Sequence, residues 1–462
     1  MNVAFGGSVR GEIDSSVLLA GTLSGEIVTL DTLDALHGDV AAGENVNVMR
    51  FSVNSGYIFA GVGGSFTETD GVVNGIAAGG TGFAGQDLYL DLLSISQGQS
   101  DPTIQATTQN WTALRAGAAQ LDVRGINGIN LKAYDLEILL NSAVTSDAAG
   151  TAVKLDWTTL DATDAPIFDA NPITDATDGI TSDLDFSVKG AVEVRIEDNV
   201  LLFGAFGVSA KTKTINDGNG TEVADASVLS LTISGATLFA GAGGAFIYDG
   251  TGRATGLEDT GTGIAVQDAN LELGIISQPS TETTPLSWVA VAGRIGQADL
   301  RGIDGIVAIA RDVTFRFNGA ATDTTKLDWT GIADFDGTRI GTIDQTLDLS
   351  FGGEIELNIQ NNVIVAAGFS GSVQTVAGVT DGVITIANAQ LVQFNLSSAY
   401  MFIGDGGAFT RVDGLADGTV TGVAQQGTGF AVTNAALDLY VVNETPATVG
   451  GAARSWTGLY AT

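Results

Sequence analysis

The chain has 462 residues, of which 19 are Lys or Arg and 53 are Asp or Glu, so its formal net charge is −34. Such a charge repels nucleic acid and anionic lipid, and it excludes both as partners. The absence of cysteine excludes disulfides, cysteine–zinc sites and thiol nucleophiles. No apolar run approaches the roughly 18 residues that a membrane helix needs, so we expect no membrane span.

A β-hairpin is predicted at the start of the chain, and it recurs twice. Its copies are VAFGGSVRGEIDSSVLLAG at residues 3–21, FSVKGAVEVRIEDNVLLFG at 186–204 and LSFGGEIELNIQNNVIVAAG at 349–368. Each copy has alternating strands around a small polar triplet, DSS, EDN or QNN. Triplets of this kind suit tight turns between antiparallel strands.

A second repeated stretch lies at residues 46–66, 227–248 and 391–409, and each copy contains GG-[AS]-F at or near its end. The middle copy is SVLSLTISGATLFAGAGGAFIY. We interpret it as a hairpin of two short strands, with Ser234-Gly235 as the turn. The same hairpin is expected in the other two copies.

Gly-Thr-Gly opens a third repeated stretch, at residues 80–96, 261–277 and 427–442. A phosphate-binding loop would need a following helix or a Lys-Ser/Thr pair, and neither follows here. We therefore interpret Gly-Thr-Gly as a turn or bulge before a long strand. A Trp follows each copy, at positions 111, 288 and 456.

A further hairpin is predicted after the first two of these tryptophans, within residues 118–141 and 295–318. Its turns are Asn127-Gly128 and Asp304-Gly305, which are strong hairpin signals. Lys-Leu-Asp-Trp then follows in both copies. The third copy stops before this hairpin, so we expect the chain to be a piece of a longer protein.

The repeats predict an all-β protein with an elongated tandem-repeat architecture of antiparallel hairpins and meanders. A parallel β-helix or solenoid is the alternative, but two-residue turns join antiparallel strands. We divide the chain into β repeat 1 (residues 1–160), an Asp-rich junction (161–185), β repeat 2 (186–333), a second Asp-rich junction (334–348) and an incomplete β repeat 3 (349–462).

No catalytic residue is predicted, and we expect that the protein is not an enzyme. His37 is the only histidine, so it cannot form a histidine-based metal centre. Carboxylates four residues apart recur as Asp87 with Asp91 and as Asp268 with Glu272. Such a pair can serve a glycosidase or a calcium site, but the third copy has Asn434 in place of the first acid. We interpret these residues as a solvated acidic stripe.

The Asp-rich junctions are the candidate metal sites. Calcium takes six to eight oxygen ligands, which clustered aspartates and backbone carbonyls can supply. Bound calcium would stiffen segments whose charges repel each other. Ordinary polar linkers are the alternative interpretation. The candidate ligands for calcium are Asp161, Asp164, Asp169, Asp175, Asp178, Asp334, Asp336 and Asp344.

Two other recurring features have structural and functional interpretations. Arg124 and Arg301 each follow an Asp by two residues, and such neighbours share a strand face, so each can form an exposed ion pair. Trp157 and Trp329 recur in Lys-Leu-Asp-Trp. They can stack on sugar if exposed, or fill the contact between repeats if buried.

The pattern of GTGF-[AV], a following Leu-Asp-Leu, SW-x-[AG]-L and RG-I-[DN]-G resembles tandem β-repeat regions of giant bacterial extracellular, adhesin-like surface proteins. The resemblance spans nearly the whole chain. It implies a location outside the cell or on its surface, a role in adhesion or matrix formation, and often bound calcium. It implies no catalytic residues.

Two functional hypotheses follow. The first is a structural or adhesive extracellular protein that self-associates into rods, fibres or a surface coat, with cell-surface glycans or other cells as further partners. The second is a carbohydrate-binding or carbohydrate-acting β-rod, which would need one acidic cleft with exposed aromatic residues. Because acids and aromatics are repeated along the chain, the sequence favours the first hypothesis.

Overall fold

The structure, a computed structural model, describes residues 3–13, 15–33, 43–97, 109–145, 152–160, 165–380, 383–412, 419–424, 427–444 and 454–462. Every strand pairing with a resolved register in these ranges is antiparallel. The predicted all-β antiparallel class is thus confirmed, and the parallel β-helix alternative is wrong. His37, Asp161 and Asp164 lie outside the described residues.

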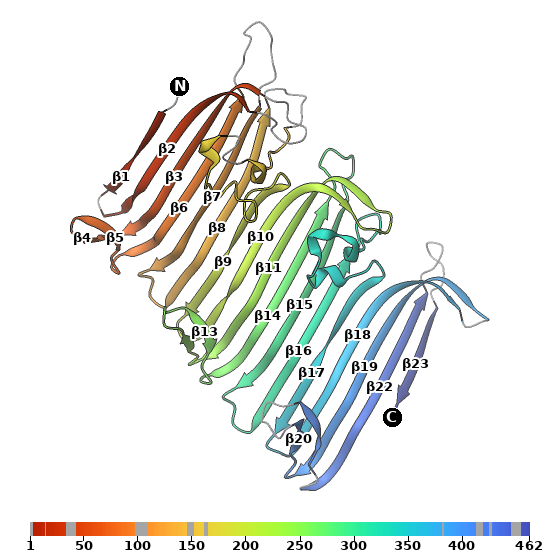
Figure 1. The fold of residues 1–462 in the computed structure, drawn as a ribbon. Helices are drawn as coiled ribbons and strands as arrows, with labels where there is room; N and C mark the ends of the chain where they lie inside the picture. The colour runs from red at the N-terminus through yellow and green to blue at the C-terminus, as the bar shows by residue number, and fades with distance from the viewer. Residues whose placement is uncertain are drawn as a thin grey trace. The chain divides into compact units, whose positions relative to one another are not determined.

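The chain divides into two units, and the first comprises Met1–Glu197 and Ala205–Lys213. Its long strands form an antiparallel meander, and a short separate hairpin joins β3 to β6 (Figure 1). The long strands are β1 (Val3–Ile13), β2 (Val17–Leu33), β3 (Gly43–Val62), β6 (Thr81–Gln97), β7 (Gln109–Arg124), β8 (Ile129–Thr145) and β9 (Leu184–Ile196), and the hairpin is β4 (Phe66–Thr69) with β5 (Val72–Ile76).

The second unit comprises Asp198–Gly204 and Thr214–Thr462 and has the same plan. Strand β10 (Val200–Asn216) contributes residues to both units. The other long strands are β11 (Glu222–Ala242), β14 (Thr262–Ser277), β15 (Ser287–Arg301), β16 (Ile306–Gly319), β17 (Leu347–Ile359), β18 (Val363–Thr380), β19 (Thr385–Asp405), β22 (Thr428–Glu444) and β23 (Ser455–Ala461), and the short hairpins are β12 (Phe246–Tyr248) with β13 (Ala254–Leu257) and β20 (Phe409–Arg411) with β21 (Val420–Val423).

Several of the predicted turns are confirmed. Asn127-Gly128 and Asp304-Gly305 connect β7 to β8 and β15 to β16, with both glycines at positive φ. The first predicted hairpin is also present, because β1 pairs with β2 and β17 pairs with β18 on either side of their polar turns. Gly-Thr-Gly leads into β6, β14 and β22, as expected.

The hairpin predicted at Ser234-Gly235 is wrong. Strand β11 continues through this position, and residues on both sides of it pair with the same neighbour, β14. Gly235 has φ +58°, and Ser55 and Ser398 occupy the corresponding left-handed positions inside β3 and β19. The small residues therefore form β-bulges within long strands, because a bulge needs the same left-handed backbone as a tight turn.

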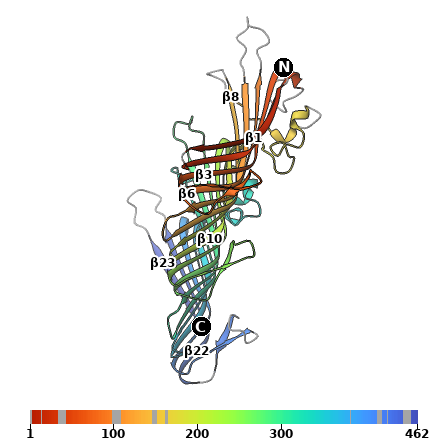
Figure 2. The same cartoon turned by 90° about the vertical axis from the view of Figure 1, so that its left-hand side faces the viewer.

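The bulges decide which face of the sheet a side chain joins. Ala265 packs beneath the β12–β13 hairpin and Ile276 packs in a second buried cluster. The two residues are 276 − 265 = 11 positions apart, a spacing that normally gives opposite faces. Figure 2 shows that the hairpin and the segment over the second cluster nevertheless lie on one side of the sheet. Asp268, at φ +52° between them, is the bulge residue that changes the alternation.

Two segments between long strands fold onto the sheet, and we call them the first cap (residues 152–160 and 165–183) and the second cap (residues 320–346). Each contains single-turn 3-10 helices: η1 (Trp157–Thr159) and η2 (Pro166–Phe168), then η3 (Trp329–Gly331), η4 (Ala333–Phe335) and η5 (Ile340–Thr342). No helix in the described part of the chain is long and apolar enough to cross a membrane.

The caps supply the largest buried clusters of the two units. Ile173 and Ile180 of the first cap are fully buried against strands β3, β6 and β7, and Leu327 and Ile343 of the second cap are equally buried. The predicted Asp-rich junctions, residues 161–185 and 334–348, overlap these caps. Their described isoleucine, leucine and phenylalanine side chains are buried against the sheet, whereas Asp169, Asp175 and Asp178 lie in turns.

The caps also define the two faces of the sheet. On β15, Trp288, Ala290 and Ala292 are buried under the second cap. We call this side the covered face. Alternate residues on a strand point to opposite sides, so Val289 and Val291 point to the other side, which we call the open face.

Candidate functional site

A single asparagine of the sheet holds each cap. Asn141, on β8, donates from Nδ2 to the carbonyl oxygens of Leu155 (2.9 Å) and Thr181 (2.8 Å), and its Oδ1 accepts from Trp157 Nε1 (3.1 Å). Asn318, on β16, binds the second cap in the same way. Both asparagines are buried: Asn141 is 4% exposed and Asn318 is 2% exposed. Each side-chain amide therefore satisfies backbone groups that water cannot reach.

The Lys-Leu-Asp-Trp motif has a structural explanation. Lys154 Nζ binds the carbonyl oxygens of Asp183 and Leu184 and the carboxylate of Asp185 (2.6 Å), which fixes the end of the cap to the start of β9. Asp156 accepts hydrogen bonds from the backbone and side chain of Thr158 and caps η1. Lys326 makes equivalent contacts in the second cap.

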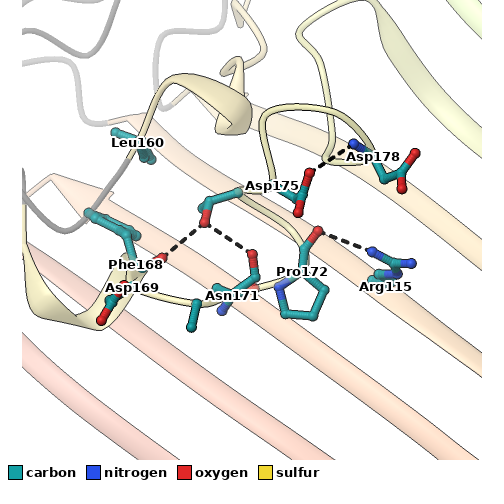
Figure 3. A pocket seen from close by; sticks show the side chains of 10 residues that line it. Arg115, Leu160, Phe168, Asp169, Asn171, Pro172, Asp175 and Asp178 are labelled. Atoms are coloured by element: carbon teal, nitrogen blue, oxygen red, sulfur yellow. Dashed lines mark hydrogen bonds between the residues drawn. The ribbon is translucent and has the colours of Figure 1, made fainter.

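A pocket of about 530 Å³ lies where the first cap meets the sheet (Figure 3). Both polar and apolar groups line it, with a guanidinium on the sheet side and carboxylates on the cap side. Thr174 Oγ1 bridges the carbonyl oxygens of Phe168 (3.0 Å) and Asn171 (3.2 Å) and shapes its wall. The lining residues are Arg115, Leu160, Phe168, Asp169, Ala170, Asn171, Pro172, Thr174, Asp175 and Asp178.

Arg115 is the cation of this pocket, and it is fixed on two sides. Its Nη1 donates to the carbonyl oxygen of Pro172 (3.2 Å), and its Nη2 lies 2.7 Å from Glu137 Oε2. Lys189 binds the other oxygen of Glu137, also at 2.7 Å. Burial raises the pKa of Glu137, but the hydrogen bonds and charges of Lys189 and Arg115 outweigh it and hold the pKa below its usual value.

Asn171 has a free donor at the same pocket. The residue is 4% exposed, and its Oδ1 accepts a hydrogen bond from Ile173 N (2.9 Å). Its Nδ2 is buried and has no hydrogen-bond partner among the described residues. A buried donor without a partner costs free energy, so this group is available to an acceptor that enters the pocket.

The predicted calcium ligands fall into two sets. Asp169, Asp175 and Asp178 line the pocket, and Asp334, Asp336 and Asp344 belong to the second cap. Among the described residues, no three metal-binding side chains gather closely enough to hold an ion.

The carboxylates of Asp175 and Asp344 are used within their own turns. Asp175 accepts from the backbone (2.8 Å) and hydroxyl (2.5 Å) of Thr177, and Asp344 makes the same bonds with Thr346. In both cases the pKa of the carboxyl lies below its ordinary value, mainly because of the hydrogen bond from the threonine hydroxyl. These contacts explain why Asp-x-Thr recurs in the caps.

The predicted Arg–Asp pairs are present, but they are not exposed. Arg124 Nη2 lies 2.7 Å from Asp122 Oδ2, and the two side chains are 15% and 9% exposed. The second guanidinium nitrogen of Arg124 donates to the carbonyl oxygen of Ala77, just after β5. Arg301 binds Asp299 and the carbonyl oxygen of Glu258 in the same manner. Each arginine thus ties a strand end to the base of a short hairpin.

Sequence reasoning missed one charged cluster. Glu356, on β17, is 4% exposed and is bound by Arg311 Nη1 (2.9 Å) and by Arg411 of β20 (Nη1, 3.0 Å). Burial raises the pKa of Glu356, but the hydrogen bonds from Arg411 and Arg311 outweigh it and lower the pKa. No local motif marks this cluster, because Arg411 lies 55 residues from Glu356 in the sequence.

The sugar-stacking interpretation of Trp157 and Trp329 is wrong, because both side chains belong to the caps and are fully buried. The paired carboxylates have separate partners. Glu272 accepts from the backbone N–H groups of Arg339 (2.7 Å) and Ile340 (3.1 Å). Asp268 binds Arg294 at 2.6 Å.

No family model matches this chain, and no curated protein is similar to it.

Proposed function

We propose that this protein is structural or adhesive, lies outside the cell or on its surface, and self-associates into rods, fibres or a coat. The observation that carries this proposal is the recurrence of the same buried contacts, Asn141 with Trp157 and Asn318 with Trp329, in successive parts of the chain. Repeating a capped sheet extends a scaffold, whereas a catalytic centre needs one specific arrangement. The sequence resemblance to adhesin-like surface repeats supports the same role.

Negative-stain imaging of the purified protein tests this role. We expect rods or filaments with a regular axial repeat at micromolar protein concentration. A static light-scattering measurement on the same sample gives the mass of the assembled species. Compact monodisperse monomers in both measurements would contradict the structural role.

We propose calcium as the cation that the Asp-rich segments bind. The support is the density of aspartates around the caps, together with the net charge of −34, which a divalent cation would reduce locally. Calorimetric titration with calcium chloride, followed by imaging after chelation, tests the proposal. Heat with a defined stoichiometry and a change of the assemblies on chelation are expected. Absence of both would exclude a role for calcium.

Carbohydrate binding is the second candidate function, and one observation favours it. The pocket at the first cap offers donors from Arg115 and Asn171 and acceptors from Asp169 and Asp178, a mixture that suits sugar hydroxyls. Saturation-transfer NMR with simple oligosaccharides tests it. Signals that disappear in an Asn171→Ala variant would support this function, and their absence in the wild type would contradict it.

A further inference from the structure

The open face of the second unit carries two continuous rows of side chains that cross nine strands. Each row is defined by cross-strand partners, whose side chains lie on the same face. The first row is Ile233, Leu271, Gly293, Phe315, Phe351, Gly371, Phe394, Leu439 and Leu459. The second row is Leu231, Leu273, Val291, Phe317, Leu349, Val373, Val392, Val441 and Thr457.

Neither row contains an ionisable residue, although the chain has 53 acidic and 19 basic residues. The charged side chains next to these rows on the same strands lie on the covered face. Glu272 and Arg316, for example, hydrogen-bond to the second cap. A face turned toward water would carry such charges, so the distribution is the reverse of a solvent-exposed sheet face.

Exposure confirms that no described element covers these rows. Phe317 is 41% exposed, Phe351 is 37% exposed and Leu459 is 67% exposed. Single exposed apolar residues are ordinary on a protein surface, but a continuous apolar patch over many strands marks a surface that contacts something else.

The rows are also flat, because phenylalanine rings lie across glycines of the next strand. A Cβ added to Gly293 would collide with the ring of Phe315, and one added to Gly371 would collide with the ring of Phe351. The rings therefore fill the space above the glycines instead of projecting outward. A flat face of this kind can approach a second flat face closely.

The first unit has an open face of the same kind. Phe5 lies across Gly25 as Phe351 lies across Gly371. Again no residue of the rows is ionisable. One row is Phe5, Gly25, Phe51, Leu92, Leu114, Leu140 and Phe186, and the next is Gly7, Leu23, Val53, Leu90, Ala116, Ile138 and Val188.

We propose that the open face of the second unit packs against the same face of a second copy of this chain, forming a two-layer β-sandwich across a two-fold axis. This inference names the surface used in self-association and so rests on the proposed structural role. An uncharged, flat, apolar face packs best against another face of the same kind. A second copy of this chain supplies such a face. A two-fold contact places the same patch on both partners, which self-complementary flat rows allow.

The face is large enough for a stable pair. Nine strands about 4.8 Å apart and roughly 13 residues long, at about 3.3 Å per residue, give a face on the order of 1,800 Å². A standard stable interface buries about 800 Å² per partner. Half of the open face would therefore be sufficient.

The negative charge of the chain does not prevent this pairing. Facing sheets lie about 10 Å apart, and the charges lie on the outer, covered sides of the two layers. At physiological ionic strength, charges separated by more than about 8 Å are largely screened. Salt therefore strengthens the pair, whereas it would weaken a contact made by ion pairs.

One pair of substitutions on β16 tests the inference. Phe317→Asp places a charge on the open face. Val307 lies beyond the bulge residue Asp312 (φ +48°), which exchanges the faces of β16, so Val307→Asp places a charge on the covered face at a site of equal exposure, 42% against 41%. Molar mass by sedimentation velocity is measured over a concentration series, at low and high salt. Circular dichroism and thermal unfolding show whether each variant is folded. Phe351→Asp is a second open-face variant if Phe317→Asp does not fold.

We expect the wild type and Val307→Asp to pair with similar affinity, which rises with salt. Phe317→Asp should weaken pairing by roughly a hundredfold, because a carboxylate would be buried without a partner. Assemblies that persist unchanged in both open-face variants would overturn the face-to-face contact and leave the structural role intact.

Two other outcomes bear on the inference. A wild type that stays monomeric up to millimolar concentration would overturn both the contact and the structural role. Monomers that bind phosphatidylcholine vesicles through the open face, with binding lost in Phe317→Asp, would assign the face to lipid and overturn the pairing.

Discussion

Trp329 Nε1 donates a hydrogen bond to Asn318 Oδ1 at 3.0 Å, and both residues are at least 98% buried. The other end of the same amide binds the carbonyl oxygens of Leu327 and Asp344, each at 3.0 Å. One side chain thus satisfies one donor and two acceptors of the second cap. This contact joins the sheet to the cap through Trp329, a member of the largest buried cluster described in this unit.

Removing this amide should loosen the cap. Asn318→Ala leaves three buried polar groups without a partner, and we expect the free energy of unfolding to fall by about 3 kcal/mol. Urea denaturation followed by tryptophan fluorescence measures the change. Asn358→Ala removes exposed hydrogen bonds on the next strand and is the control. Equal midpoints for the two variants would contradict the assigned role of Asn318.

Glu356 should make stability depend on pH in the acid range. Its pKa in the folded protein is lowered from the reference value of 4.5. A depressed carboxyl pKa contributes stability that is fully present above the unfolded pKa and is lost as the pH falls through the folded pKa. The free-energy difference between the wild type and Glu356→Gln is therefore expected to be constant above pH 4.5 and to shrink below it.

The comparison with Glu356→Gln separates this carboxyl from the many others that titrate with it. Thermal unfolding from pH 3 to pH 7 supplies the data. A difference that does not change over this range would mean that the ion pairs with Arg311 and Arg411 do not perturb Glu356.

The glycines beneath the phenylalanine rings should not tolerate a methyl group. Gly371→Ala would force the ring of Phe351 away from the sheet, and we expect destabilisation by about 1–3 kcal/mol. Gly7→Ala is the matched control, because a Cβ there meets no atom within 4 Å. We expect that variant to be neutral or slightly stabilised. The melting temperatures of the two variants measure the difference. Equal values would contradict the close contact between Gly371 and the ring of Phe351.

The bulge residues should resist β-branched substitution. Asp268 has φ +52°, a conformation that Asp and Asn adopt more readily than Val. Both Asp268→Gly and Asp268→Val lose the ion pair with Arg294 and the side-chain hydrogen bond from Asn270, so their difference reports the backbone conformation. We expect the Val variant to be less stable than the Gly variant by about 1–3 kcal/mol, measured by chemical denaturation. Equal stability of the two variants would contradict the left-handed bulge conformation assigned to Asp268.

Features that depend on local chemistry could be predicted from the sequence. Asn127-Gly128 specifies a tight turn regardless of what surrounds it, and the strands on either side of residues 125–128 pair as expected. Ser234-Gly235 shows the limit of this reasoning. A left-handed residue fits a tight turn and a bulge equally well, and only the pairing of both flanks with β14 distinguishes them.

The packing of the caps on the sheet could not be predicted from their composition. Their aspartates suggested solvated junctions, but Ile173 and Ile180, both fully buried, form the inner side of the first cap. Their seven-residue spacing equals two helical turns, but the intervening sequence TDATDG carries no large apolar residue, so no strand or helix pattern predicted their burial. The cluster of Glu356 and Arg411 could not be predicted either, because it forms only when the β20–β21 hairpin folds back on the sheet.

The bulges also bear on how such a chain can change in length. An insertion of one residue beside Asp268 would exchange the two faces for the rest of β14, moving Glu272 to the apolar side and Leu271 to the charged side. Duplication of a complete repeat keeps every bulge in register with the bulges of the neighbouring strands. We therefore expect relatives of this protein to differ by whole repeats and by loop lengths, while the strands themselves keep constant residue counts.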